Sequence, residues 1–505
     1  MEQTLSSVML DGSTIIIGER IQHNCGPAPA LVTLSTTDRR SPFIIGGVTE
    51  SNIWTNYLLP LIQQDLMTLE KKTSERELSG ITLLIQDRTQ FEDAKELLSS
   101  SLFQSVQIWQ SDDIPWHLNP LEGTPHQAAA VLLRMISTLS DPTKKLHPLA
   151  EEHVLAHTLL IKFLHQFQSI ILYLSETNRS ERGNKSLVSI DTYQSLFQST
   201  QCTIDEWLRM YADPVLVVKA TRTLEMLATY LEQNHPKYSV NIGEMRSIVR
   251  FMEACYQERT VSRTTLSYVT QQRGTPLLYL QENQVEKVLY PLGHPHEQEK
   301  VMQDTYSEHL ASVLSSCMFL RTNTAFRSLL IGKEGHPLFE HFNSGGILLV
   351  YINDLWGTDI SRSLLHTLWL ATLEQYALHR SPQTDHSIVI TEGTTYLCRE
   401  YRDGHLLKRG RRKGVFITCG VRDFRLLRNM CSISHFETIL ASFPNRIIDV
   451  SVYDPHLHFF LRSDIDSLEE FERMRPDLSL KTVSVFRSSV SGNKPLLIKG
   501  IKHIQ

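Results

Sequence analysis

The sequence lacks several features that mark common protein classes. Its seven cysteines form no CxxC pair and are widely spaced, which predicts a reducing compartment and neither a disulfide framework nor a cysteine-rich zinc site. No apolar run reaches the roughly 18 residues of a membrane-spanning helix. The first residues show no basic segment followed by a long apolar one, so we expect no signal peptide. We therefore expect a cytoplasmic protein with no integral membrane span.

The modest glycine and proline content, the small net charge and the missing hydrolase motifs exclude further classes of protein. With 23 glycines and 20 prolines in 505 residues, the chain is neither collagen-like nor of low complexity. A net charge of −5 argues against a protein coated in nucleic acid, although it leaves room for a local basic patch. GxSxG, HExxH and catalytic Cys–His signatures are all missing, so hydrolase chemistry of those kinds has no support.

The hydrophobic pattern divides the chain into three parts. Short apolar runs alternate with helical periods in the first and last thirds, which predicts an α/β fold with a mostly parallel sheet. A helical period dominates the middle. We therefore expect one α/β domain, formed by residues 1–123 and 336–505, interrupted by a mainly all-α domain at 124–335. Near the C-terminus, Ile447–Tyr453 and His456–Leu461 are expected as antiparallel edge strands.

One turn has the setting of a phosphate-binding loop. The apolar run Phe43–Ile45 leads into glycines and then into a helical period, as in the pattern GxxxxGK[ST]. The aligned residues are Gly46, Gly47, Val48, Thr49, Glu50, Ser51, Asn52 and Ile53. Only the first glycine matches the pattern, as Gly46. Asn52 cannot supply the cation for the β- and γ-phosphates, Ile53 cannot coordinate Mg²⁺, and Glu50 would repel an anion. An ordinary turn between a strand and a helix is the alternative interpretation.

A second segment has the form of a Walker B strand. Ser387–Ile390 is a mainly apolar run, followed by Thr391 and Glu392. In an active enzyme of this type, an aspartate holds the Mg²⁺ shell and the following acid polarises the attacking water. Thr391 stands at the aspartate position while Glu392 is retained. Metal-binding residues are thus replaced in both motifs, which favours a vestigial nucleotide site over two coincidences.

The order of these motifs resembles that of the HerA/FtsK superfamily of P-loop ATPases. The resemblance is greatest to the TraG-like coupling ATPases of type IV secretion and conjugation. Further segments match that order: Ile85–Arg88 at an Asp-Pro-Lys-like motif, Leu118–Leu121 before the helical domain, Gly345–Asp354 before a long helix, and Arg411–Thr418 before a sensor strand. The sensor glutamine would fall at Gly420 or Val421 and is absent. The resemblance implies a RecA-like P-loop NTPase core interrupted by a large all-α insertion.

A basic segment stands out in the last third. Residues 397–430 hold ten Lys and Arg against three Asp and Glu. Such a segment can contact phosphates or a neighbouring subunit, or it can simply be a solvated face. The candidate contact residues are Lys408, Arg409, Arg411, Arg412 and Lys413.

Several other groups receive ordinary interpretations. His294 with His296, and His456 with His458, lack the partners of a zinc site, so we expect no metal. Two acidic groups, Glu151–His153 and Asp112–Asp113, are expected at the surface. The six tryptophans are expected in the core: Trp54, Trp109, Trp116, Trp207, Trp356 and Trp369.

The favoured hypothesis is a pseudo-ATPase that serves as a structural or adaptor subunit of a secretion, conjugation or DNA-processing assembly. It implies protein partners, a homo- or mixed ring, possible contact with DNA, and no cofactor. ATP and Mg²⁺ would bind only if that hypothesis is wrong. Two alternatives remain: an active mixed-ring DNA translocase component that supplies Glu392 or arginine fingers to a partner ATPase, and a plain DNA-binding module.

Overall fold

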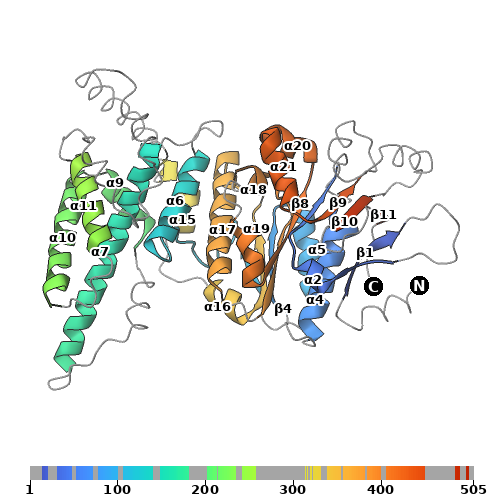
Figure 1. Cartoon of the computed structure of the whole chain (residues 1–505), viewed down its shortest axis with the longest axis horizontal. Helices are drawn as coiled ribbons and strands as arrows, with labels where there is room; N and C mark the ends of the chain where they lie inside the picture. Colours follow the sequence, from blue (N-terminus) through green and yellow to red (C-terminus); the bar gives the residue numbers. More distant parts are fainter. Residues whose placement is uncertain are drawn as a thin grey trace. The chain divides into compact units, whose positions relative to one another are not determined.

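A computed structural model describes the chain in several stretches. The described residues are 14–20, 31–47, 53–71, 78–99, 106–139, 148–180, 202–212, 214–234, 242–256, 313, 316, 319–320, 322–330, 338–353, 356–380, 384–399, 405–449, 484–488 and 496–499. The chain divides into two compact units. Met1–Pro115 with His336–Gln505 form the α/β unit, and Trp116–Gly335 form the helical unit (Figure 1).

The α/β unit is built on one 11-stranded sheet, whose order is β2-β1-β11-β10-β9-β3-β8-β7-β4-β6-β5. The strands from β9 to β5 in that order pair in parallel, while β2, β1, β11, β10 and β9 pair antiparallel. The strand bounds are β1 Thr14–Arg20, β2 Leu31–Ser35, β3 Phe43–Gly46, β4 Leu78–Ile85, β5 Val106–Gln110, β6 Gly346–Tyr351, β7 Asp385–Ile390, β8 Val415–Val421, β9 Asn445–Asp449, β10 Ser484–Ser488 and β11 Leu496–Lys499. The prediction of an α/β fold with a mostly parallel sheet is confirmed.

Helices cover both faces of the parallel strands (Figure 1). On one face, Phe91 of α5 (Arg88–Ser99) stacks on Tyr351 with ring centroids 4.4 Å apart. On the other, Trp369 of α17 (Asp359–His379) meets Trp109 edge-on at 4.9 Å. Trp109 pairs with Val350 in the sheet register, so it faces away from Tyr351. Coverage on both faces explains why strands such as β7 and β8 are buried along their whole length.

The remaining helices of the α/β unit are short, except for α4. They are α2 Thr36–Arg39, the π-helical turn η1 Trp54–Leu58, α4 Leu59–Lys71, α16 Leu338–Ser344, α18 Thr394–Arg399, α19 His405–Arg409, the 3₁₀ turn η3 Gly410–Lys413, α20 Phe424–Met430 and α21 Ile433–Ala441. Ile62 of α4 belongs to the same apolar core as Ile81 and Leu83 of β4. The helix that follows the candidate phosphate loop is therefore held against the centre of the sheet.

The expectation of an antiparallel edge strand from Ile447 is wrong. β9 begins at Asn445 and lies inside the sheet, parallel to β3 on one side and antiparallel to β10 on the other. Both flanks of a strand can be filled by segments distant in sequence, and a local apolar pattern does not reveal them. The second predicted strand, His456–Leu461, lies outside the described residues.

The helical unit contains α6 Pro125–Leu139, α7 Pro148–Ser180, α9 Ile204–Ala212, α10 Pro214–Asn234, α11 Ile242–Tyr256 and α15 Thr324–Leu330. Four other helices, α6, α9, α10 and α11, pack against α7. Residues Glu152 to Phe163 of α7 are all buried, so this stretch is enclosed on every side. Among its enclosed polar side chains, Lys162 donates to the Leu121 carbonyl, whereas the Glu152 carboxylate has no hydrogen-bond partner among the described residues.

The surface assignment of Glu151–His153 is wrong for two of its three residues. Glu151 is exposed, but Glu152 and His153 are buried inside the bundle. Burial raises the pKa of Glu152 to about 8 and lowers that of His153 to about 3, because each loses solvation of its charged form. Asp112 and Asp113 are exposed, as expected, and all six tryptophans are buried. Within the described residues, no helix is long and apolar enough to cross a membrane.

Candidate functional site

The two nucleotide-type motifs meet at one edge of the sheet. Gly46 ends β3 level with Val421 of β8, while Ile390 of β7 lies level with Cys419. Thr391 and Glu392 therefore follow β7 at the same carboxyl edge, on the far side of β8 from Gly46. Two strand spacings separate the motifs by about 10 Å. The sequence-predicted motifs thus flank one point, which is where open α/β sheets bind ligands.

Gly46 is packed against an aromatic ring. A Cβ built on Gly46 would overlap Cε2 of Phe424, the first residue of α20, and would lie 2.5 Å from its Cζ. Phe424 is itself buried. Next to it, the backbone N–H of Gly47 donates to the Val421 carbonyl at 3.3 Å. Close packing against Phe424 is therefore a sufficient steric reason for glycine at position 46, and it does not require a bound phosphate.

The rest of the loop is described only in part. Val48, Thr49, Glu50, Ser51 and Asn52 lie outside the described residues. Ile53, at the position of the Mg²⁺-binding hydroxyl, is 3% exposed and belongs to the apolar core. An apolar side chain at this point anchors the start of the helix and offers no oxygen ligand.

The Walker B-like end is also engaged by its own chain. The Glu392 carboxylate accepts a hydrogen bond from the Thr394 backbone N–H at 3.0 Å, at the start of α18. Thr391 is buried, and its hydroxyl has no hydrogen-bond partner among the described residues. Glu392 therefore acts at a helix N-terminus, where a carboxylate is favourable.

The predicted sensor position is closed. A Cβ on Gly420 would approach the Thr391 carbonyl oxygen to 2.5 Å, and the Gly420 carbonyl accepts the Gly393 N–H at 2.6 Å. A glutamine at position 420 would therefore push away the backbone of Thr391, which follows β7. Nearby Asp87, in the Asp-Pro-Lys-like motif, accepts the Gln90 N–H at 2.9 Å and so caps α5.

The candidate contact residues of the basic segment lie elsewhere. Arg409, Arg411 and Arg412 are exposed and Lys413 is half-buried, on α19 and η3, directly before β8. The backbone of Lys408 belongs to α19, and nothing is described of its side chain. β8 has seven residues, so at about 3.3 Å per residue the segment lies about 20 Å from the motif edge. These residues and the nucleotide-type motifs therefore lie at opposite ends of β8, whereas Arg422, Arg425 and Arg428 of the same basic segment follow β8 at the motif edge.

A buried charge cluster beneath the motifs was missed by the sequence analysis. Arg39 of α2 donates to Asp65 of α4 at 2.7 Å, and both side chains are 3% exposed. The guanidinium also donates to Thr418 of β8 at 2.9 Å. Ser387 of β7 donates to the same Asp65 oxygen at 2.9 Å. Arg39 and Asp65 are 26 positions apart in the sequence and belong to no motif, so only the folded topology reveals that they pair.

The packing of Gly46 gives a direct prediction. We expect Gly46→Ala to lower the free energy of unfolding by about 1–3 kcal/mol, because the new methyl group overlaps the Phe424 ring. Urea denaturation measures the loss. Gly46→Ala combined with Phe424→Leu should recover part of it, as contacting residues do in a double-mutant cycle. The matched control is Gly243→Ala in α11, where a Cβ has no neighbour within 4 Å. Equal stability of Gly46→Ala and Gly243→Ala would contradict the prediction.

Comparison with known proteins gives structural likeness without sequence likeness. No family model matches the chain, and no curated protein matches it. Among solved structures, the plasmid coupling protein TrwB with a non-hydrolysable GTP analogue is similar at a TM-score of 0.47 and 11% identity, covering 97% of this chain and 95% of that one. VirB4 of Thermoanaerobacter pseudethanolicus is similar at a TM-score of 0.44 and 10% identity, covering 98% and 97%. Over most of its length, the chain is therefore similar to solved structures of a conjugative coupling protein and of VirB4.

Proposed function

We propose that the chain is a catalytically inactive relative of the coupling and HerA-type ATPases. In this proposal it is a cytoplasmic pseudo-ATPase that serves as a structural or adaptor subunit of a secretion, conjugation or DNA-processing assembly. It joins protein partners in a homo- or mixed ring. Its domains are residues 1–123 with 336–505, which supply the RecA-like surface for assembly, and the inserted residues 124–335, which bind a partner.

One observation carries the proposal: three positions that nucleotide chemistry requires are engaged by the chain itself. Phe424 packs on Gly46, Ile53 lies in the apolar core, and the Glu392 carboxylate caps α18. The sequence adds the loss of the phosphate-binding lysine at Asn52 and of the Mg²⁺-binding aspartate at Thr391. Without these groups, neither charge neutralisation nor metal positioning is available, and those supply most of phosphoryl-transfer catalysis.

Isothermal titration of the purified full chain with ATP and Mg²⁺ tests the proposal. We expect a Kd weaker than about 1 mM, which corresponds to less than about 4 kcal/mol of binding free energy. We also expect no phosphate release above the buffer rate. Thermal unfolding with and without nucleotide is the second readout, since a ligand that binds only the folded state raises Tm. Micromolar binding accompanied by turnover would overturn the proposal.

The exposed basic segment favours DNA binding as a second candidate function. Arg409, Arg411 and Arg412 are exposed on η3 and the end of α19, free to approach phosphates. The mixed-ring alternative uses Arg411 and Arg412 as arginine fingers, or Glu392, to complete a partner's site. Glu392 lies at the opposite end of the strands from Arg411 and Arg412. A single nucleotide site on a neighbouring subunit therefore cannot receive both Glu392 and these arginines from this chain.

Neutralising Arg411 and Arg412 tests the DNA-binding candidate. With the double variant Arg411→Ala and Arg412→Ala, we expect DNA binding to weaken and the slope of log affinity against log salt to fall by about 2. Fluorescence anisotropy over a salt series measures it. The matched control is Lys219→Ala with Arg222→Ala on α10, which removes the same charge from exposed positions of the helical unit. Equal losses in both double variants would reduce the effect to net charge and refute a DNA site at Arg411 and Arg412.

A further inference from the structure

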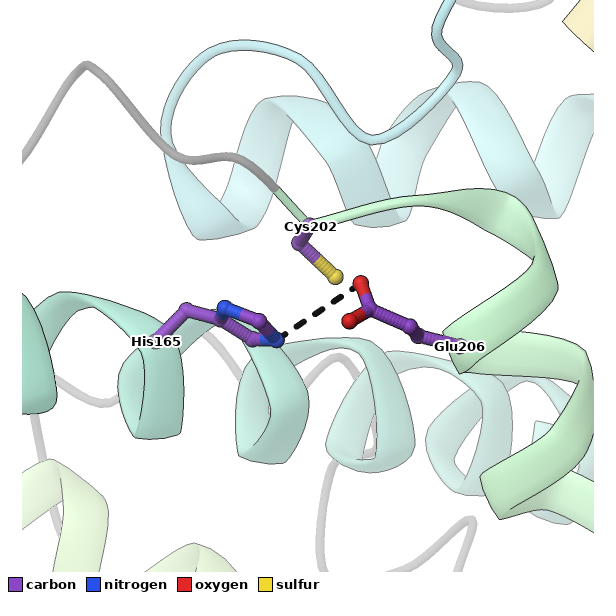
Figure 2. Close-up of side chains that lie close together, drawn as sticks. All are labelled: His165, Cys202 and Glu206. Atoms are coloured by element: carbon purple, nitrogen blue, oxygen red, sulfur yellow. Dashed lines mark ion pairs between the residues drawn. The ribbon is translucent and has the colours of Figure 1, made fainter. Parts of the chain in front are cut away.

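Three metal-type ligands converge inside the helical unit, away from every motif discussed above. His165 lies on α7, Cys202 lies two residues before the start of α9, and Glu206 lies in the first turn of α9. Figure 2 shows the three side chains pointing toward one another. One ligand atom from each, an imidazole nitrogen, the thiol sulfur and a carboxylate oxygen, lies within 4.8 Å of the other two.

Local structure fixes two of these side chains before any ligand is considered. Glu206 forms a capping box with Thr203: its carboxylate accepts the Thr203 backbone N–H at 2.9 Å, and the Thr203 hydroxyl accepts the Glu206 N–H at 3.4 Å. The Cys202 carbonyl accepts the Asn119 side-chain N–H at 3.0 Å. The start of α9 is therefore held in place, which pre-organises the carboxylate and the thiol.

The spacing suits a tetrahedral ion. Two ligands bound at about 2.1 Å in tetrahedral geometry lie about 3.4 Å apart. Nε2 of His165 is already 3.7 Å from Oε2 of Glu206. The ligand atoms lie within 4.8 Å of one another, so binding an ion would require them to close in by at most about 1.4 Å. One nitrogen, one thiolate sulfur and one carboxylate oxygen, with the fourth position open, form a donor set typical of Zn²⁺.

The site has an uneven exposure that suits entry of an ion. Cys202 is fully buried, whereas the side chains of His165 and Glu206 are 27% and 42% exposed. An ion can therefore arrive from the His165 and Glu206 side and reach the sulfur behind them.

The surrounding charges act on the thiol in opposite directions. Burial raises the pKa of Cys202 to about 12, and Glu206 adds to this, while the Lys162 ammonium opposes it. Lys162 is buried and donates to the Leu121 carbonyl at 2.5 Å.

We propose that His165, Cys202 and Glu206 bind a zinc-type divalent transition-metal ion that ties the start of α9 to the middle of α7. The proposal is independent of the proposed function, because none of its residues belongs to the nucleotide-type motifs. The capping box with Thr203 is the alternative explanation for the position of Glu206. The experiment must therefore distinguish a helix cap from a metal site.

The variant Glu206→Gln separates them. Glutamine also serves in a capping box, so the helix cap is preserved while the anionic ligand is lost. The full chain, stripped with a chelator and titrated with Zn²⁺, should bind about one equivalent. Glu206→Gln and His165→Gln should each weaken binding by about 100-fold or more, and Cys202→Ser should abolish the thiolate-to-metal absorption band of the Co²⁺ form. The matched control Cys431→Ser, a half-buried cysteine on another unit, should bind as the parent does.

Thermal unfolding provides the second readout. Zn²⁺ should raise the Tm of the parent chain and of Cys431→Ser but leave that of Glu206→Gln unchanged. The proposal is overturned if the parent chain takes up no Zn²⁺ beyond the Cys202→Ser level, or if Glu206→Gln retains full affinity. Because His165 and Glu206 are partly exposed, their variants keep the test decisive even if Cys202→Ser fails to fold.

Discussion

Replacing Arg39 with methionine should lower the free energy of unfolding by about 3–5 kcal/mol, among the largest losses we expect from one substitution. The reason is the fate of Asp65, whose carboxylate is buried and would lose its only cation among the described residues. Ser387 would remain as its hydrogen-bond donor, which does not compensate a buried charge. Urea denaturation with the α/β unit's tryptophan fluorescence measures the loss.

A second substitution separates the cost of the orphaned charge from the value of the pair. We expect Arg39→Met with Asp65→Leu to lose less than Arg39→Met alone, because a buried pair replaced by apolar groups of similar size is often nearly neutral. The exposed pair Arg246–Glu232, with side chains 40% and 47% exposed, is the matched control. Arg246→Met should cost at most about 1 kcal/mol. If Arg39→Met behaves like Arg246→Met, the buried pair does not hold the fold as described.

The position of this pair links stability to the proposed function. Arg39 and Asp65 join α2 and α4 to β8 through Thr418, and Ser387 adds β7. Of these elements, β7 precedes the Walker B-like pair, β8 holds the expected sensor position, and α4 follows the phosphate-type loop. Their relative placement is therefore fixed by internal charge pairing and hydrogen bonds, which act whether or not nucleotide is present. A pseudo-ATPase needs such a scaffold, because no bound phosphate is there to order the edge of the sheet.

Element positions were the part of the fold that the sequence predicts best. Apolar runs such as Gly346–Ile352 and helical periods such as Pro214–Gln233 fall within or almost within β6 and α10. Local periodicity determines which face of a segment is buried, and this information lies within about ten residues. The resemblance in motif order likewise placed Gly46 and Glu392 at one edge, where β3 and β7 end.

Pairings between distant segments were not predictable in this way. β9 was expected at the edge because nothing in its own residues names β3 as a neighbour. Glu152 and His153 have a surface composition, yet α7 is enclosed by other helices. The His165, Cys202 and Glu206 cluster has no consensus spacing, and only the Cys-x-x-x-Glu step hints at it. Each of these features depends on which elements meet, which is tertiary information.

Acidification should destabilise the protein steeply below pH 6.5, and this is the other large effect that we expect. Five buried histidines have lowered pKa values: His153, His157, His341, His366 and His386. Burial is the first cause for each, and for His341 the pKa falls to about 4. In the unfolded chain, the ordinary histidine pKa of about 6.5 returns. The unfolded state therefore binds more protons between about pH 6.5 and pH 4, and stability falls as pH falls.

The two units should differ in this response. The α/β unit holds three of the histidines, and each contributes up to about 1.4 kcal/mol per pH unit while it stays neutral. The helical unit holds two, and there Glu152 acts in the opposite direction. Its pKa is raised to about 8, so the folded state binds the extra proton between about pH 4.5 and 8. The helical unit should therefore lose less stability on acidification than the α/β unit.

A pair of histidines in the α/β unit allows the assignment to be tested. The Thr82 hydroxyl lies 2.8 Å from Nε2 of His341 and 2.9 Å from Nε2 of His386, so one buried hydroxyl serves both rings. We expect the double variant His341→Gln and His386→Gln to reduce the proton uptake on unfolding of this unit by about two. Urea unfolding at several pH values measures that slope. Gln375→Ala on α17, which removes no titratable group, is the control and should leave the slope unchanged. In the parent chain, a free energy of unfolding that stays constant from pH 7 to pH 5 would contradict the assignment. Constant stability would mean that unfolding takes up no protons, whereas buried neutral imidazoles should gain protons when they become exposed.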